Sequence, residues 1–356
     1  MSDFRSDTVT RPTAAMKQAM MEAPLGDDVY GDDPTINRLQ ETAAEMLGFE
    51  AGLFAPSGTQ TNLIALMTHC ARGEEAIVGQ QWHTYRWEAG GMAVLGSIQP
   101  QPLEHQADGT IALADIERAI KPDDSHFART RLVVLENTTG GKVLPPAYMQ
   151  AVSALARRNG LRAHIDGARL FNAAVALASA QGGDPYREAR RLCDGYDSVS
   201  LCLSKGLGAP VGSLLLGTRD FVREARRIRK MLGGGMRQAG LLAAAGLHAL
   251  QHHVHRLADD HANAHLLAQG LAEAVAANGS LRERVTVHPA QTNVVFMDVA
   301  AVCAAPLQRH LDAAAVRVTS GLQPTQDGRT RMRWVTHLDV GPDDVERAVG
   351  AVAAFH

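Results

Sequence analysis

Two short segments carry side chains that could do chemistry together. Asp166 and Arg169 stand three residues apart in the string HIDGAR, and Lys205 follows later in the string LSKGLG. A carboxylate can keep the nitrogen of a heteroaromatic ring protonated, and a guanidinium can donate to a phenolate oxygen. A partly desolvated lysine beside other cationic charge can act as an amine nucleophile. Taken singly, the acid could be a helix cap and the two cations exposed side chains, so the interpretation rests on the combination.

A phosphate site is predicted elsewhere in the chain. Residues 56–62 read PSGTQTN and lead into the helical pattern LIALMTHC. The backbone N–H groups of Gly58 and Thr59 would open that helix and face an anion. A phosphate site, a ring-nitrogen acid, a phenolate arginine and a reactive amine together meet the requirements of pyridoxal 5′-phosphate.

Other kinds of chemistry lack their local signatures. The nearest approach to a dinucleotide fingerprint, GLGAPV at 206–211, has Val where the third glycine is needed, and GxxxxGK[ST], HExxH and GxSxG do not occur. Histidine pairs at helical spacing between residues 248 and 265 could bind a metal. A polar helix face is the preferred interpretation, and no metal is expected.

The reactive residues must be positioned by the crossover units of a mostly parallel sheet, since strand-like and helical patterns alternate through the first two thirds of the chain. The clearest unit comprises a strand at 131–137, a helix opened by Pro145 and Pro146 and ended by RRNG, and a strand at 161–166. Because such crossovers are right-handed, Asp166 is expected at the carboxyl end of its strand, where open α/β sheets bind ligands.

A further strand, SVSLCLS at 198–204, ends in a glycine-rich turn and predicts Lys205 at the same edge of the sheet. From about residue 241 long Ala/Leu/His helical stretches follow, and then strands at 293–299 and 331–337. We therefore expect a cofactor-binding large domain with an N-terminal arm at 1–245 and a small C-terminal α/β domain at 246–356.

Composition and charge exclude several classes of protein. The chain has 356 residues, is 46% hydrophobic and carries a formal charge of −3, which fits a two-domain globular protein. Neither nucleic acid nor an anionic membrane is favoured as a partner. Aromatic residues make up only 4%, so the core must consist mainly of Ala, Leu and Val. Four cysteines without CxxC spacing and an N-terminus without an apolar signal core predict a soluble, cytoplasmic protein.

Longer strings resemble the low-specificity L-threonine aldolases, which are pyridoxal phosphate enzymes of fold type I. The resemblance extends from about residue 4 to residue 350. It rests on the strings RSDTVTRP (5–12), GDDVYGDDP (26–34), SGTQTN (57–62), HTYRWEAGG (83–91), HIDGARLFNA (164–173), CLSKGLGAPVGS (202–213), GGGMRQAG (233–240) and WVTHLD (334–339).

The resemblance implies a carbon–carbon lyase that cleaves L-threonine, L-allo-threonine and related L-3-hydroxy amino acids to glycine and an aldehyde. Another fold-type I activity, β-elimination or transamination, remains as the alternative, because the same cofactor residues suit all of them. A catalytically silent binding protein is disfavoured, because binding alone does not require a reactive amine.

The resemblance also implies roles for particular residues. Lys205 would carry the cofactor as a Schiff base. Asp166 would pair with the ring nitrogen, and Arg169 would contact the phenolate oxygen and the substrate. His83 would stack over the ring, and His83 and His126 are both candidates for the base that acts on the β-hydroxyl. The other cofactor-binding residues implied are Gly58 and Thr59 at the phosphate, Glu88 beside His83, and Ser204.

The substrate carboxylate would be held by Ser6 and an arginine. Arg331 and Arg333 share one face of the predicted strand, so spacing alone does not choose between them. The family pattern R-x-V-T-H selects Arg333, whose planar fork suits a carboxylate.

The family also implies a homotetramer, a dimer of dimers with active sites at the dimer interface. Tyr30 in the substrate site, and Lys230 and Arg237 toward the phosphate, match positions contributed across a subunit boundary. One segment departs from the family: residues 136–143 read ENTTGGKV where ENTHNGKV is expected. None of the roles above depends on the two replaced residues.

Overall fold

The computed structural model describes residues 1–325 and 327–356, with the backbone alone at 322–324. The chain forms two compact units, which we call the sheet unit, Pro12–Val254, and the C-terminal unit, Met1–Arg11 with His255–His356. The sequence-based division differs in two places, since it assigns residues 246–254 to the smaller domain and residues 1–11 to the larger one. As a division into functional domains it stays a prediction.

The sheet unit is built on seven strands in the order β2-β8-β7-β6-β5-β3-β4. Strand β8 runs opposite to the other six strands, which are all parallel to one another, and this confirms the predicted mostly parallel sheet. The strands are β2 (Ala51–Ala55), β3 (Glu75–Gly79), β4 (Gln99–Leu103), β5 (Thr130–Glu136), β6 (Arg162–Asp166), β7 (Ser198–Cys202) and β8 (Ser213–Gly217). Strand β4, QPQPL, lies at an edge, where its two prolines do not interrupt a ladder on both sides.

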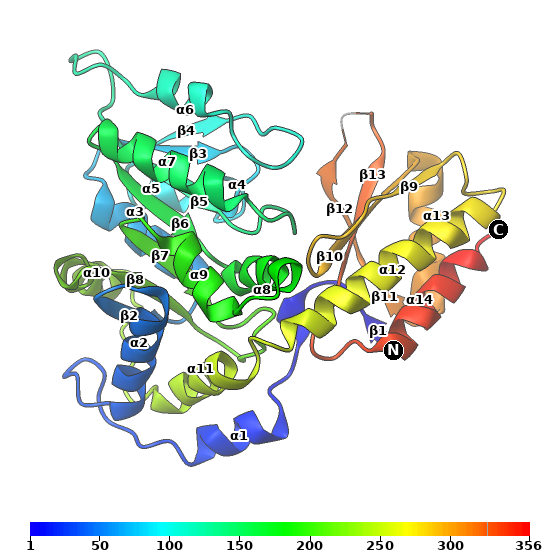
Figure 1. Cartoon of the computed structure of the whole chain (residues 1–356), viewed down its shortest axis with the longest axis horizontal. Helices are drawn as coiled ribbons and strands as arrows, with labels where there is room; N and C mark the ends of the chain where they lie inside the picture. The colour runs from blue at the N-terminus through cyan, green and yellow to red at the C-terminus, as the bar shows by residue number, and fades with distance from the viewer. Residues whose placement is uncertain (326) are drawn as a thin grey trace. The chain divides into compact units, whose positions relative to one another are not determined.

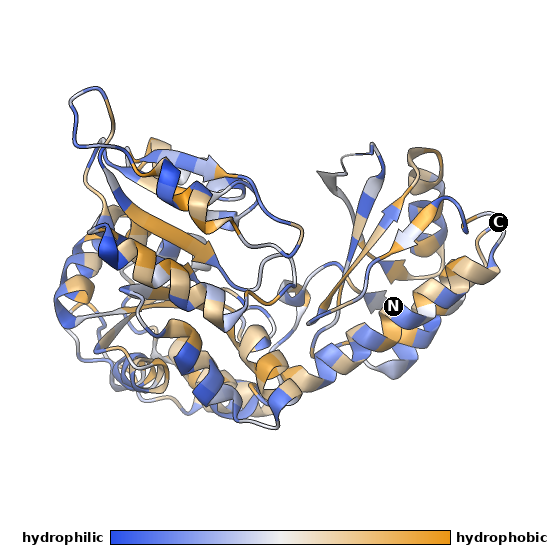
Figure 2. Cartoon of the chain, turned by 45° about the horizontal axis from the view of Figure 1, so that its top comes forward, coloured by the Kyte–Doolittle hydropathy of each residue, from blue (hydrophilic) through white to orange (hydrophobic). Residues whose placement is uncertain are grey.

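Helices cover both faces of this sheet (Figure 1). Leu53 and Leu215 pack with α3 and α10 on one face, while Gly52 and Leu216, one position along each strand, meet α2 on the other. The helices of this unit are α1 (Ala14–Met21), α2 (Pro34–Leu47), α3 (Gly58–His69), α4 (His83–Arg86), α5 (Gly91–Val94), α6 (Leu113–Ala119), α7 (Pro146–Arg158), α8 (Leu170–Gln181), α9 (Pro185–Cys193), α10 (Arg219–Met231) and α11 (Gly240–His252). Figure 2 shows orange, apolar strand segments within this unit, next to helices whose ribbons mix blue, polar and orange, apolar residues.

The predicted crossover unit is confirmed. Helix α7 begins at Pro146, whose fixed φ and missing N–H suit the first turn, and joins β5 to β6. Strand β7 ends at Cys202, two residues before the predicted end, so that Ser204 and Lys205 lie in the turn that follows it.

In its described residues, the C-terminal unit combines a four-stranded antiparallel sheet, in the order β12-β13-β10-β9, with three α-helices and a short 3₁₀ helix at Asp7–Val9. Its elements are β9 (Val285–Val287), β10 (Val294–Val299), β12 (Thr319–Pro324), β13 (Thr330–Val335), α12 (Leu257–Ala277), α13 (Ala301–Ala313) and α14 (Pro342–Ala353). Across the described residues, no helix is both long enough and apolar enough to span a membrane.

The N-terminal segment belongs to this unit through backbone pairing. Strand β1 (Ser2–Asp3) lies parallel to β11 (Val316–Arg317), and Val335 donates to the carbonyl of Phe4 at 2.8 Å. The Phe4 ring is fully buried and contacts Trp334 edge-on, with ring centroids 5.7 Å apart. Phe4 therefore anchors the segment that carries Ser6.

We predict that Phe4→Ala destabilises the C-terminal unit by about 3–5 kcal/mol, because it removes a buried ring and leaves a cavity beside Trp334. Val302→Ala in the same unit is the control, since Val302 is 73% exposed. Denaturant unfolding of both variants checks this, and an equal, small effect of the two would contradict the anchoring role.

Candidate active site

Three neighbouring strands present chemically active side chains at one edge of the large sheet. Glu136 and Asp166 are the last residues of β5 and β6 and are partners in register. Lys205 follows the end of β7, the next strand along. The carboxyl ends of these parallel strands thus meet where a ligand site is expected.

Asp166 is 2% exposed and is held by two donors. Its Oδ1 accepts from the backbone N–H of Ala168 at 3.1 Å, and its Oδ2 accepts from Asn62 Nδ2 at 2.8 Å. The next residue must be Gly167, because a Cβ there would lie 2.7 Å from the carbonyl oxygen of Ser200. The string HIDG therefore produces a buried carboxylate with a defined orientation.

His83 is oriented by two acids. Its Nδ1 lies 2.8 Å from Glu88 Oε1, and its backbone N–H donates to Glu136 Oε2 at 2.6 Å. Burial opposes protonation of the imidazole, but the hydrogen bond to Glu88 and the charge of Asp166 outweigh burial and raise the pKa of His83. With Nδ1 on Glu88, the ring leaves Nε2 for another partner.

The pKa values of Glu88 and Glu136 are both raised above the usual value of a glutamate. Burial, followed by the charge of Asp166, raises the pKa of Glu136 to about 7. Burial also raises the pKa of Glu88, although the hydrogen bonds from His83 and Asn62 oppose it. The charge of Lys205 lowers the pKa of both His83 and Glu136, which places its ammonium within electrostatic reach of this cluster.

Asn62 connects two of these acids. Its Nδ2 lies 2.8 Å from Glu88 Oε1 and 2.8 Å from Asp166 Oδ2. Ligand atoms of His83, Glu88 and Asp166 all lie within 4.8 Å of one another, a spacing that could surround a metal ion. The N–H groups of the amide bridge the two carboxylates, however, and they would repel a cation placed between them.

The predicted phosphate site lies at the beginning of α3. Ser57 caps this helix by accepting from the N–H of Gln60 at 3.2 Å. Gly58 and Thr59 occupy the first two helical positions, where the helix itself offers no acceptor for their N–H groups. Asn62 lies one turn further along the same helix, so this helix start and the acid cluster are adjacent.

The remaining predicted residues of the sheet unit lie as follows. Arg169 is half-buried directly before α8. His126 lies in the loop between α6 and β5, where its side chain is 84% exposed and its Nδ1 is 2.7 Å from Asp124 Oδ1. The structure thus joins His83, Glu88 and Asp166 by hydrogen bonds, and it gives His126 a partner of its own.

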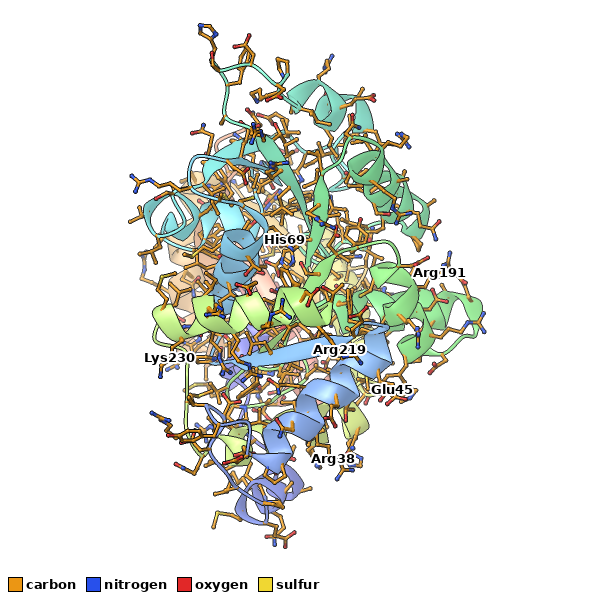
Figure 3. All side chains as sticks on the ribbon, turned by 90° about the vertical axis from the view of Figure 1, so that its left-hand side faces the viewer. Arg38, Glu45, His69, Arg191, Arg219 and Lys230 are labelled. Carbon is orange, nitrogen blue, oxygen red and sulfur yellow. The ribbon has the colours of Figure 1, made fainter. Side chains whose placement is uncertain are left out.

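The residues predicted to act across a subunit boundary are exposed in the single chain. Tyr30 is 78% exposed, and Arg237 pairs with Asp27 at 3.1 Å. Lys230 is exposed near the C-terminal end of α10, at the opposite end from Arg219 (Figure 3).

In the C-terminal unit, the structure separates the two arginines that spacing left equivalent. Arg331 is bound in a bidentate pair by Asp298, with both N···O distances 2.7 Å. Arg333 instead donates through Nη2 to the carbonyl of Arg5 at 3.1 Å, beside Ser6. The guanidinium of Arg331 is therefore already occupied by a carboxylate, and Arg333 and Ser6 are brought together by the N-terminal segment.

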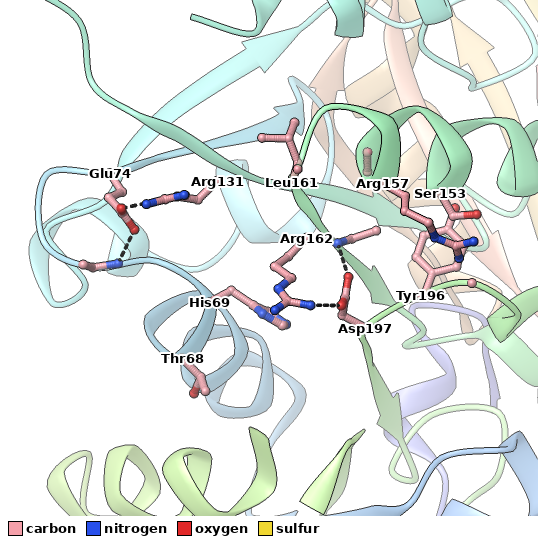
Figure 4. A pocket seen from close by; sticks show the side chains of 15 residues that line it. Thr68, His69, Glu74, Arg131, Ser153, Arg157, Leu161, Arg162, Tyr196 and Asp197 are labelled. Atoms are coloured by element: carbon pink, nitrogen blue, oxygen red, sulfur yellow. Dashed lines mark hydrogen bonds and ion pairs between the residues drawn. The ribbon is translucent and has the colours of Figure 1, made fainter. Parts of the chain in front are cut away.

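A cavity of about 870 Å³ lies at the opposite end of the sheet, where the parallel strands β5 and β6 begin (Figure 4). Its lining includes Arg131, the second residue of β5, and Arg162, the first residue of β6, and none of the predicted site residues. Arg131 pairs there with Glu74 at 2.7 Å and Arg162 with Asp197 at 2.8 Å, so much of its charge is balanced internally. The predicted site residues lie instead at the carboxyl ends of these strands.

Two members of the acid cluster, Asn62 and Glu136, were not predicted from the sequence. Glu136 ends the apolar string RLVVLE and could have been recognised as the counterpart of Asp166. Asn62 directly precedes the apolar run LIALM of α3 and is buried with it, and a buried amide of this kind needs partners. Its two partners come from sequence positions 88 and 166, which no local pattern reveals.

We predict that Glu136→Gln stabilises the chain at pH 8 relative to the wild type, and much less at pH 5. An acid with a raised folded-state pKa supports folding while protonated and loses that support as the pH rises from about 4.3, the unfolded value, toward 7. Glutamine imitates the protonated acid at every pH. Thermal unfolding at both pH values checks this, with Glu117→Gln on the exposed face of α6 as the control. A stability difference that does not change with pH would contradict the expected titration.

Comparison with known proteins identifies relatives over the whole chain. The Beta-eliminating lyase family matches residues 3–302. The low specificity L-threonine aldolase of Escherichia coli (strain K12) is 51% identical over 355 residues, which cover 100% of this chain and 99% of that protein. The low-specificity L-threonine aldolase 1 of Arabidopsis thaliana is 45% identical over 352 residues, 96% of this chain and 93% of that protein.

The fold has relatives among solved structures. A Leishmania major threonine aldolase matches with a TM-score of 0.82 at 23% identity, covering 99% of this chain and 98% of that chain. This likeness shows the shared fold, and the sequence identities above show the family. The chain belongs to the low-specificity L-threonine aldolases, within the beta-eliminating lyase family.

Proposed function

We propose that this protein cleaves L-threonine, L-allo-threonine and related L-3-hydroxy amino acids to glycine and an aldehyde, with pyridoxal 5′-phosphate as its cofactor. It is a carbon–carbon lyase of fold type I. The observation that carries the proposal is the cluster at the carboxyl edge of the sheet, where a buried Asp166 and the His83–Glu88 pair lie within electrostatic reach of Lys205.

The residues present fit this cofactor. Lys205 supplies an amine for covalent attachment, and the two free N–H groups at the start of α3, at Gly58 and Thr59, suit a phosphate. Asp166 offers a fixed, buried carboxylate for a protonated ring nitrogen. Arg169 would donate to the phenolate oxygen. When bound, pyridoxal phosphate supplies an electron sink for the bond that breaks.

The chain's own residues would select that bond. Arg333 and Ser6 would hold the substrate carboxylate and orient the Cα–Cβ bond for cleavage, since positioning decides which bond reacts. The occupied state of Arg331 supports this choice of arginine. Arg169, Tyr30 and His126 would also line the substrate site, and Ser204 the cofactor site.

His83 would act as the base. Glu88 holds its Nδ1, so Nε2 is available to take the proton of the β-hydroxyl as the Cα–Cβ bond breaks and the aldehyde leaves. A proton then returns to Cα to give glycine. His126 is the second candidate, either directly or through water.

We also propose a homotetramer, a dimer of dimers, in which Tyr30, Lys230 and Arg237 complete the site of a neighbouring subunit. The exposure of these three side chains in the single chain supports this. A cytoplasmic location is proposed as well, supported by four cysteines that are all free.

The assay that tests the activity is product identification from L-threonine. We expect glycine and acetaldehyde, whereas β-elimination, which the family description makes the second candidate, would release ammonia and 2-oxobutanoate. Borohydride reduction followed by peptide mapping should place the cofactor on Lys205, and Lys205→Ala should abolish this label together with activity. Labelling of a different lysine would overturn the assignment.

We predict that His83→Asn lowers kcat for L-threonine by about 10²–10⁴-fold if His83 transfers the proton directly. The wild-type rate should fall as the pH drops below neutrality, because the raised pKa of His83 keeps the imidazole protonated there. His126→Asn is the matched comparison under the same conditions. A large loss in the His126 variant with little loss in the His83 variant would move the base to His126.

A further inference from the structure

We propose that Asn62 is a positioning residue of this site, which bridges Glu88 and Asp166 with its two N–H groups and links the base His83 to the ring-nitrogen acid. The inference rests on the proposed function, because the roles of these acids come from it. Nothing in the family resemblance assigns a role to Asn62.

The geometry of the amide is the first argument. Asn62 is 2% exposed, and its Nδ2 lies 2.8 Å from an oxygen of each acid. The NH₂ group has two hydrogens, so each carboxylate receives one. Glu88 Oε1 also lies 2.8 Å from His83 Nδ1, which makes a continuous chain from the imidazole through Glu88 and Asn62 to Asp166.

The orientation of the amide follows from its surroundings. If Asn62 were turned over, its Oδ1 would face two carboxylate oxygens and repel both. In the observed orientation, Oδ1 is buried and has no hydrogen-bond partner among the described residues. The side chain thus leaves its own carbonyl unsatisfied, which costs free energy, while both of its N–H groups serve the acids. An apolar residue that only filled this space would not leave a buried polar atom unsatisfied.

The charges around the amide explain why a donor is needed there. Glu88 and Asp166 both bond to the amide of Asn62. Glu136 bonds to the backbone N–H of His83, and the charge of Lys205 acts on both His83 and Glu136. Buried carboxylates that face one another favour protonation of one member. A neutral donor that bonds to both favours two ionised acids. Glu88 can then accept from His83 Nδ1, and Asp166 can face a protonated ring nitrogen.

Two variants of similar volume test this role in the cofactor-loaded enzyme. Asn62→Asp replaces the donor by a third carboxylate. The acidic limb of the kcat/KM profile for L-threonine should move up by about one pH unit, because the added negative charge favours the protonated form of the base His83. Asn62→Leu removes the donor without adding charge. Its dissociation constant for pyridoxal phosphate should rise by roughly 10- to 100-fold, the effect of losing hydrogen bonds to charged groups.

Thr68→Val is the matched control. Thr68 lies further along α3, is half-buried, and donates through Oγ1 to the carbonyl of Ile64 at 2.6 Å. We expect its pH profile and cofactor affinity to stay at wild-type values, whatever the change in its thermal midpoint. If both Asn62 variants behave like Thr68→Val, the positioning role is wrong and Asn62 is only structural.

The test also separates this inference from the proposed function. If the wild-type enzyme binds pyridoxal phosphate but releases no glycine from L-threonine, the proposed function fails. The role of Asn62 is then decided by the cofactor dissociation constant and by the pH titration of the bound cofactor's absorbance in wild type and variants. A wild-type titration left unchanged by Asn62→Asp would overturn the inference independently of activity.

Discussion

The site depends on the hydrogen bonds that hold two buried carboxyl groups, those of Asp166 and Glu88, close together. Asp166 is fixed by the N–H of Ala168 and the amide of Asn62, and Glu88 by Asn62 and His83. Without these donors, the two carboxyl groups would be buried close together with fewer hydrogen-bond partners, which disfavours a pair of like charges. The hydrogen-bonded network therefore sets the electrostatic character of this edge of the sheet.

Most residues of this network lie at the ends of strands or at the start of a helix. Parallel strands β5 and β6 end in register, so Glu136 and Asp166 meet without any flexible connection. The start of α3 lies beside them and contributes both the free N–H groups of Gly58 and Thr59 and the amide of Asn62. Side chains carried on strand ends and helix starts hold their geometry better than side chains on long loops. His126 shows the contrast, because it lies exposed in a loop with a partner of its own.

In the C-terminal unit, the N-terminal segment and Asp298 give two arginines of β13 different partners. The N-terminal segment pairs with β11 and packs Phe4 against Trp334, so that the carbonyl of Arg5 accepts from Arg333. Asp298 meanwhile occupies Arg331. Arg331 and Arg333 lie on the same face of β13, but their chemical surroundings differ. Arg331 is bound by an acid of β10, and Arg333 bonds to the N-terminal segment.

The sequence by itself determined the α/β class, the crossover from β5 through α7 to β6, the positions of Asp166 and Lys205 after apolar strands, and the family through its long motifs. These depend on local patterns of hydrophobicity, turn residues and short motifs, which neighbouring residues carry. Only the tertiary structure decided that Asn62 bridges Glu88 and Asp166, that Glu136 joins the cluster, and that Arg331 is already paired. Each of these facts is a contact between residues far apart in the chain. Hydrogen bonds and ion pairs are set by distances of a few ångströms, and spacing along a sequence does not contain such distances.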